Sequence, residues 1–127
     1  MGATGFYVTA TGVSARDAFI NARDEALYEH GHGGYTGSIA EKTSFTMLDV
    51  PSDMSCETWA TIVDESVVYY GETEEKCKAE IKKRFAISDE LVNKAFRQNL
   101  AVCDKWGPAG CIDLGGGRYC FFGMASC

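Results

Sequence analysis

The sequence predicts an α+β fold, in which a small antiparallel sheet carries helices packed on one of its faces. Three β-prone segments occur, at residues 5–11, at residues 43–48 and around a glycine-rich turn at residues 111–124. Between them lie segments whose apolar residues recur at helical spacing. Because strands and helices do not alternate strictly along the chain, the pattern favours α+β over a parallel α/β sheet.

The amino-terminal part predicts a strand over residues 5–11, followed by a helix. Ser14 is a candidate N-cap, with Asp17 three residues later in the place of a capping-box acid. The helix should continue to about residue 30, because Gly31 can adopt the left-handed backbone conformation that ends a helix. Its polar side holds the charged residues Arg16, Asp17, Arg23, Asp24 and Glu25.

The middle of the chain predicts three further helices. Ser52 is interpreted as the N-cap of a helix over residues 53–65. The second helix covers residues 72–85, with acidic residues early and basic residues late, as the helix dipole favours. Ser88 is the N-cap of the third helix.

Residues 111–124 predict a hairpin, but two registers remain open. A two-residue turn at Gly115 and Gly116 would place Cys111 opposite Cys120. A three-residue turn would instead pair Cys120 with Ile112.

The composition fits a single domain over residues 1–127. The chain has 127 residues, of which 46% are hydrophobic and 24% charged, as in ordinary globular domains. Its net charge of −6 argues against a grip on duplex DNA, which requires a basic face.

Other classes of protein are disfavoured by what the chain lacks. The first eleven residues show no secretion signal, and no apolar run is long enough to span a bilayer. The six cysteines form no C-x-x-C pair that would anchor zinc or dithiol chemistry, so most are expected to be small buried hydrophobic side chains. We therefore expect a cytoplasmic protein with no membrane contact, no metal and no cofactor.

A glycine-rich loop at residues 31–38 (GHGGYTGS) is the best candidate for ligand binding. Consecutive glycines let backbone N–H groups converge on an anion, and an aromatic ring can stack on a flat ligand. The loop lacks the spacing of a Walker or dinucleotide motif, and the alternative is a tight connection that packs against the sheet. Its candidate ligand-binding residues are Gly33, Gly34, Tyr35, Thr36 and Ser38.

The second unusual segment is residues 105–110 (KWGPAG). Trp106 directly precedes a rigid Gly-Pro turn, and its side chain either covers the core or lines a pocket. Arg118 would line the same pocket, because its guanidinium suits phosphate. His30 and His32 form an H-x-H pair, but without further ligands at recognisable spacing a helix-end and loop role is favoured over metal binding. No catalytic residue is assigned.

Three strings carry a resemblance to a known group. Residues 28–42 (YEHGHGGYTGSIAEK), residues 105–112 (KWGPAGCI) and residues 121–123 (FFG) resemble short accessory proteins of tailed bacteriophages and prophages. The resemblance implies expression in the cytoplasm of a bacterial host. It also implies that residues 67–104, which lie outside the resembling strings, are a helical insertion relative to that group. Small phage proteins without enzyme motifs are often counter-defence factors. The comparison with such factors rests on size and context alone, and it assigns no binding residue to this chain.

These observations predict three functions, in order of preference. The first is a binding protein that sequesters a nucleotide-derived immune signal of the cyclic-nucleotide or ADP-ribose type. It would use the loop backbone for phosphate, Tyr35 or Trp106 for stacking and Arg118 for charge, and a pocket shared between subunits would favour a homo-oligomer. The second is a protein–protein inhibitor of a host nuclease or of a CRISPR or restriction complex. The third is a small enzyme that degrades the signal, with His30 or His32 as acid or base.

Overall fold

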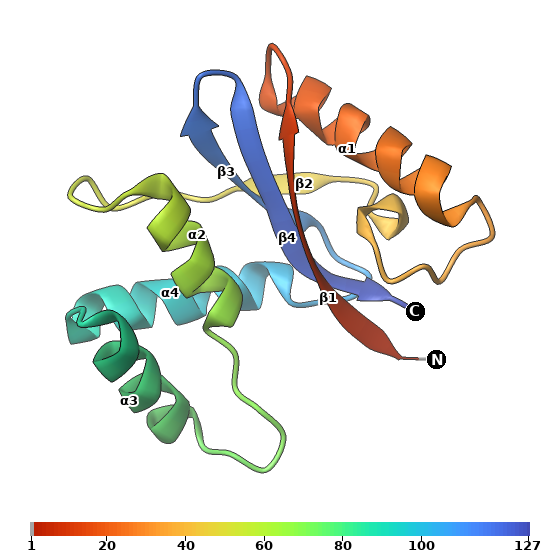
Figure 1. The fold of residues 1–127 in the computed structure, drawn as a ribbon. Helices are drawn as coiled ribbons and strands as arrows, with labels where there is room; N and C mark the ends of the chain where they lie inside the picture. The colour runs from red at the N-terminus through yellow and green to blue at the C-terminus, as the bar shows by residue number, and fades with distance from the viewer. Residues whose placement is uncertain (1) are drawn as a thin grey trace.

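The structure, a computed structural model that describes residues 2–127, contains one four-stranded sheet with helices on both of its faces (Figure 1). In chain order the elements are β1 (Ala3–Thr11), α1 (Ala15–His30), the 3₁₀ helix η1 (Ile39–Glu41), β2 (Phe45–Met47), α2 (Cys56–Glu65), α3 (Glu74–Phe85), α4 (Asp89–Val102), β3 (Ala109–Gly115) and β4 (Arg118–Ser126).

The strands lie in the order β1-β4-β3-β2. The pairs β1–β4 and β4–β3 are antiparallel, whereas β2 runs parallel to β3. The predicted α+β class is therefore confirmed, and the prediction of a wholly antiparallel sheet is wrong at β2. The reason is the long connection between β2 and β3, since the chain passes through α2, α3 and α4 and can return to the same end of the sheet before β3 begins.

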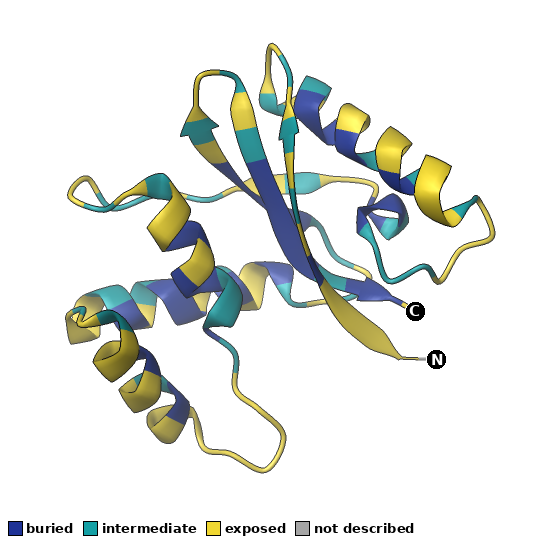
Figure 2. Cartoon of the chain, viewed as in Figure 1, coloured by how far each residue is buried: buried dark blue, intermediate teal, exposed yellow. Residues whose placement is uncertain are grey.

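Helices cover both faces of the sheet, so the prediction of helices on one face is also wrong. Successive residues of β4 point to opposite faces: Phe121 packs in a core with α1 and η1, and Phe122 packs in a second core with α2, α3 and α4. Figure 2 shows the central strand β4 buried along most of its length. A strand buried on both faces is a nearly continuous apolar run, which explains the CFF sequence in β4.

The hairpin between β3 and β4 adopts the second of the two registers considered above. Ile112 pairs with Cys120, but the turn does not have the three residues expected with that register. A register shift between Asp113 and Gly115 pairs Gly115 with Arg118 and leaves Gly116 and Gly117 as the turn residues. All three glycines at this end of the hairpin have positive φ angles, of 86°, 65° and 78°. The thiols of Cys111 and Cys120 are free and lie in different cores on opposite faces of the sheet.

Local capping signals place most helix ends correctly. The Ser14 side chain accepts a hydrogen bond from the Asp17 N–H, and Gly31 ends α1 with a φ of 82°. The start of α2 differs from the prediction, because Ser55 rather than Ser52 accepts the capping hydrogen bond. None of the described helices is long and apolar enough to cross a membrane.

Truncation of either aromatic core side chain of β4 is expected to weaken the whole fold. Phe121→Ala and Phe122→Ala should each lower the free energy of unfolding by about 3–5 kcal/mol, because each leaves a cavity in a fully buried core. Urea titration followed by circular dichroism and by tryptophan fluorescence measures this loss. Since the two cores share β4, the two signals should move together.

Tyr28→Ala is the matched control for these variants. Its ring is 91% exposed on α1, so the free energy of unfolding should change by less than about 0.5 kcal/mol. Separate transitions for the two spectroscopic signals would contradict a single cooperative domain.

Candidate functional site

The glycine-rich loop closes tightly against the ends of β1 and β4. The Gly37 N–H donates a hydrogen bond to the Ser126 carbonyl oxygen at 2.8 Å. Gly37 has a φ of 68°, and a Cβ atom there would collide with the side chain of Thr4. Gly33 and Gly34 are exposed, and Gly34 also has a positive φ, of 79°. Part of the glycine content therefore serves the connection itself.

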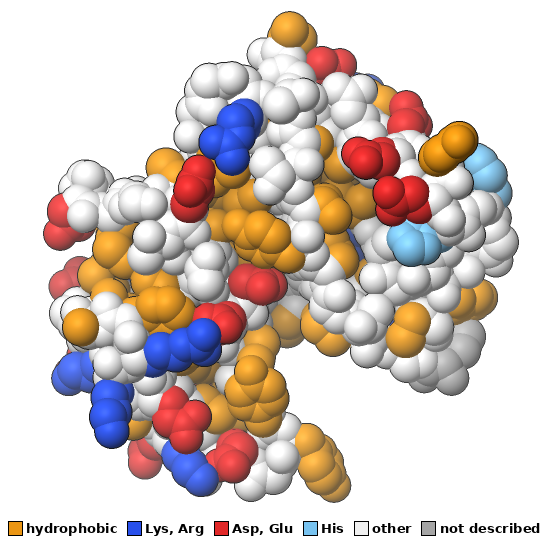
Figure 3. All heavy atoms as spheres, in the orientation of Figure 1, with side chains coloured by type: hydrophobic (Ala, Val, Ile, Leu, Met, Phe, Trp, Pro, Cys, Tyr) orange, Lys and Arg blue, Asp and Glu red, His pale blue; other side chains and the backbone are white. Residues whose placement is uncertain are grey.

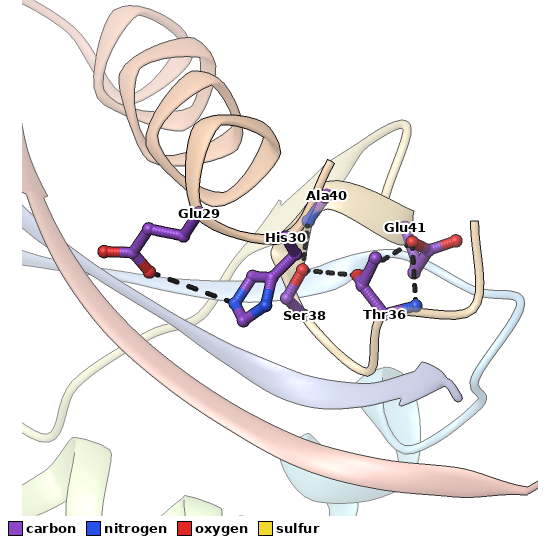
Figure 4. Close-up of polar contacts among 6 residues, drawn as sticks. All are labelled: Glu29, His30, Thr36, Ser38, Ala40 and Glu41. Atoms are coloured by element: carbon purple, nitrogen blue, oxygen red, sulfur yellow. Dashed lines mark hydrogen bonds and ion pairs between the residues drawn. The ribbon is translucent and has the colours of Figure 1, made fainter. Parts of the chain in front are cut away.

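The donors of the loop converge on a carboxylate of the same chain, that of Glu41 (Figure 4). One Glu41 oxygen accepts hydrogen bonds from the Thr36 N–H at 3.2 Å and from the Thr36 hydroxyl at 2.8 Å. The Thr36 and Ser38 hydroxyl oxygens lie 2.7 Å apart. The Ser38 hydroxyl also accepts from the Ala40 N–H. The loop is thus an anion-binding turn whose anion is built into the protein.

The electrostatics of Glu41 agree with this geometry. Burial favours the neutral acid, but the hydrogen bonds from Thr36 and the Tyr35 backbone, together with the charge of Arg23, outweigh it and hold the pKa of Glu41 below its ordinary value. The carboxylate therefore remains charged and keeps the Thr36 donors engaged.

The structure brings together the two aromatic residues that the sequence analysis selected. The rings of Tyr35 and Trp106 meet edge to face, with centroids 6.5 Å apart. Both side chains are more than half exposed, and the Lys105 ammonium lies 5.3 Å from the Trp106 ring. Tyr35 has a φ of 55°, which is rare for a residue with a side chain.

A buried lysine holds the turn that presents Trp106. Lys42 is 1% exposed, and its ammonium donates to the carbonyl oxygens of Asp104, Lys105 and Gly107 at 3.0, 3.3 and 3.0 Å. Burial lowers the pKa of Lys42, and the charge of Asp104 partly opposes that shift. The Trp106 turn is therefore fixed to the segment between η1 and β2.

Arg118 is not part of this arrangement. It begins β4 at the hairpin end of the strand, whereas Gly37 is bonded to Ser126 at the opposite end. Nine residues of extended strand cover about 30 Å, so the two ends lie far apart. The Arg118 guanidinium instead lies 3.4 Å from the Glu57 carboxylate.

The face covered by α1 has an open groove on each flank of the helix. A helix with its side chains is about 10 Å wide. The axes of four neighbouring strands span about 14 Å, so a single helix leaves part of this face uncovered. The opposite face is covered by three helices, and there the core is more extensive.

The groove between α1 and β1 is acidic and has a volume of about 480 Å³. Glu25 and Glu29 line it from α1, beside His30, whose imidazole lies 3.9 Å from the Glu29 carboxylate. Ser38 and Gly37 of the glycine-rich loop close one end. Its charged lining opposes a phosphate ligand.

The groove between α1 and β2 is basic and has a volume of about 390 Å³. Arg16 and Arg23 line it, seven residues apart and therefore on one side of the helix. Arg23 donates from one Nη to the Ala40 carbonyl oxygen at 3.3 Å, while its buried Nε has no partner within residues 2–127. The remaining lining consists of Phe19, Ile20, Thr43, Ser44 and Phe45.

Sequence reasoning missed this basic groove because it assigned both arginines to the solvated side of the helix. The seven-residue spacing was visible, but it could not reveal that Thr43 and Ser44 lie opposite. Thr43 and Ser44 line one cavity with Arg16 and Arg23. Phe19 and Phe45 line it too, and their ring centroids are 5.1 Å apart.

Two further groups, neither of which lines either groove, have raised pKa values. Burial, with a smaller effect from Glu65, raises the pKa of Asp64 on α2 to about 6. Burial, followed by the charges of Cys120 and Asp113, raises the pKa of Cys111 to about 12, which keeps this thiol protonated and unreactive. Among residues 2–127, no group of three or more His, Cys, Asp or Glu side chains could hold a metal ion.

Comparison with known proteins finds no matching family model, no similar curated protein and no similar solved structure.

Removal of the Glu41 charge is expected to loosen the loop in a pH-dependent way. Glu41→Gln should lower the free energy of unfolding at pH 7 by about 1 kcal/mol, because charge-assisted hydrogen bonds from Thr36 become neutral ones. The pKa of Glu41 is lower in the folded than in the unfolded chain. Its stabilisation is therefore fully present above the ordinary value of 4.5 and is lost as the pH falls through the folded value.

Urea titrations of both proteins at pH 7, 5 and 3 measure this difference. The gap between wild type and Glu41→Gln should shrink toward pH 3. Asp24→Asn, at an exposed position in the middle of α1, should match the wild type throughout. A gap that does not change with pH would show that the loop does not depend on the Glu41 charge.

Proposed function

We propose that the chain is a binding protein that captures a small phosphate-bearing, nucleotide-like anion in the groove between α1 and β2. The observation that carries this proposal is the joint presence of Arg16, Arg23, Thr43 and Ser44 around one cavity with a phenylalanine floor. Guanidinium groups and hydroxyls are the donors that phosphate oxygens require, and an aromatic floor suits a flat base.

The unpartnered Nε of Arg23 supports this placement. A buried N–H without an acceptor is costly, and a ligand oxygen in the groove would supply the acceptor. The volume of about 390 Å³ lies within the range of small-molecule sites. Such capture depends on complementarity and requires no catalytic group.

The resemblance to tailed-phage accessory proteins suggests the purpose of this capture. We propose sequestration of a nucleotide-derived immune signal, either a cyclic nucleotide or an ADP-ribose derivative. The sequence analysis assigned the phosphate to the glycine-rich loop. The Thr36 donors of that loop are already bonded to Glu41, so we assign the phosphate contact to the arginines of α1 instead.

Thermal unfolding against a panel of cyclic dinucleotides, cyclic trinucleotides and ADP-ribose isomers tests the proposal. A ligand at a hundredfold to a thousandfold of its Kd stabilises the folded state by ~3–4 kcal/mol, which should raise the midpoint by about 10 °C. Arg16→Gln and Arg23→Gln should each weaken binding by about tenfold or more, because each removes a charge-assisted hydrogen bond.

Arg97→Gln is the matched control, since Arg97 is exposed on α4 and does not line the groove. Arg118→Ala should likewise leave the midpoint shift unchanged, because Arg118 lies at the hairpin end of β4. A panel without any shift, or a shift that survives both groove substitutions, would overturn the proposal.

A second candidate function, inhibition of a host nuclease or of a CRISPR or restriction complex, is favoured by an exposed apolar patch. Val68, Tyr69, Tyr70 and Leu100 are all about half exposed or more, and the patch adjoins a mainly apolar cavity of about 330 Å³. Exposed apolar patches mark protein interaction sites.

Tyr70→Ser combined with Leu100→Ser should abolish co-purification with a host protein. The same substitutions should leave nucleotide-induced stabilisation unchanged. Retained co-purification would exclude this patch as the contact.

A further inference from the structure

The outer edge of β1 presents backbone groups that no other strand of residues 2–127 uses. Gly2 and Cys127 exchange both backbone hydrogen bonds, and Gly12 donates to Gly117, so the even-numbered residues of β1 face β4. The odd-numbered residues therefore direct their N–H and C=O groups outward. These residues are Ala3, Gly5, Tyr7, Thr9 and Thr11.

Among residues 2–127, only the Thr11 end of this edge is capped. The Asn21 side chain of α1 donates to the Thr11 carbonyl oxygen at 2.9 Å. From Ala3 to Thr9 the outward backbone groups have no hydrogen-bond partner in the described part of the chain. The other edge strand of the sheet, β2, has only three residues, whereas β1 has nine.

The sequence of β1 contains none of the usual protections of an edge strand. ATGFYVTAT has no charged residue and no proline, and its register with β4 is continuous, without a bulge. Natural sheets use lysine, proline or bulges to prevent an exposed edge from pairing with another chain. A long, regular, uncharged edge is instead the template for strand addition.

The acidic groove runs along this same edge. Phe6, Val8, Ala22 and Ala26 form its apolar part, and the two alanines on α1 leave room beside the strand. Glu25 and Glu29 form its charged rim. Figure 3 shows acidic side chains gathered over α1, above the uncharged surface of β1.

We infer that this edge and groove bind an extended, basic peptide segment of another protein, which adds to β1 as a fifth strand. The backbone of the segment pairs with the outward groups of Tyr7 and its odd-numbered neighbours. Alternate side chains of the segment point toward α1, where lysine or arginine reaches the Glu25 and Glu29 carboxylates.

The spacing of the two acids fits this mode. Residues four apart in a helix are separated by about 6 Å along its axis. Side chains on one face of a strand recur every ~6.6 Å, so lysines two residues apart can meet Glu25 and Glu29 in turn.

Charge favours this occupant over a second copy of the chain. Pairing of β1 with β1 of another copy would place two α1 helices on the same face of a continuous sheet, with Glu25 and Glu29 of each copy facing those of the other. Each copy also carries a net charge of −6. Like charges brought together in this way oppose association, whereas a basic segment neutralises them.

The test uses an acetylated, amidated nine-residue peptide that alternates lysine and valine, with binding measured by fluorescence anisotropy at low and high salt. We expect saturable binding that weakens with salt. A peptide that alternates glutamate and valine should not bind, and methylation of alternate backbone nitrogens should weaken binding by about tenfold or more, because it removes the donors of the ladder.

Thr9→Pro tests the edge, because its N–H points away from β4 and the substitution removes no internal ladder hydrogen bond. Binding should be lost in Thr9→Pro and retained in Thr9→Val, which keeps the N–H. Glu25→Gln combined with Glu29→Gln should weaken binding by about tenfold and reduce its salt dependence. Glu90→Gln, away from the groove, is the charge control.

Two results would overturn the inference. One is binding that is unaffected by backbone methylation or by the Glu25 and Glu29 substitutions. The other is the absence of saturable binding of the lysine–valine peptide. A dimer that light scattering detects and that Thr9→Pro abolishes would then identify a second copy of the chain as the occupant. If Thr9→Pro fails to fold, the methylated peptide and the glutamine variants still decide the outcome. None of these variants alters Arg16 or Arg23, so a failure here is distinct from failure of the nucleotide site.

Discussion

The arrangement of this protein depends on unequal coverage of a four-stranded sheet. Three helices cover one face and bury a broad core around Trp59, whereas α1 and the three-residue helix η1 cover the other face. A single helix over four strands must leave space along its flanks. The charges of α1 then decide the character of each flank: arginines face β2 and glutamates face β1. One helix thus creates two grooves of opposite charge.

The fold could be predicted where the signals are local. Ser14 and Gly31 bound α1 because a cap depends only on nearby residues. The β3–β4 hairpin was also visible in its glycines. The direction of β2 and the second covered face could not be predicted, since both depend on how distant segments meet. Ser52 was predicted to cap α2, but Ser55 also precedes the apolar run. The Thr58 N–H donates a hydrogen bond to the Ser55 side chain, which identifies Ser55 as the cap.

The residues of the candidate site could be selected from the sequence, but the contacts between them could not. Tyr35 and Trp106 were selected separately, and the structure places them in contact through a turn held by buried Lys42. No sequence pattern could show that the glycine-rich loop would close on Glu41, although that acid lies only five residues after Thr36. Arg118 was selected because its guanidinium can bind phosphate. It lies at the opposite end of β4 from the glycine-rich loop and is not part of that site.

The positions of two thiols in the central hairpin constrain how the chain can mature. In the native register Cys111 and Cys120 lie on opposite faces, and a shift of one residue would place them directly opposite each other. Cα atoms of directly opposed antiparallel residues lie about 4.5–5.5 Å apart, within the range of a disulfide. That shift would also turn Phe121 and Phe122 to the wrong cores. A disulfide between Cys111 and Cys120 is therefore incompatible with the native register, and its formation before the hairpin pairs would favour the shifted sheet.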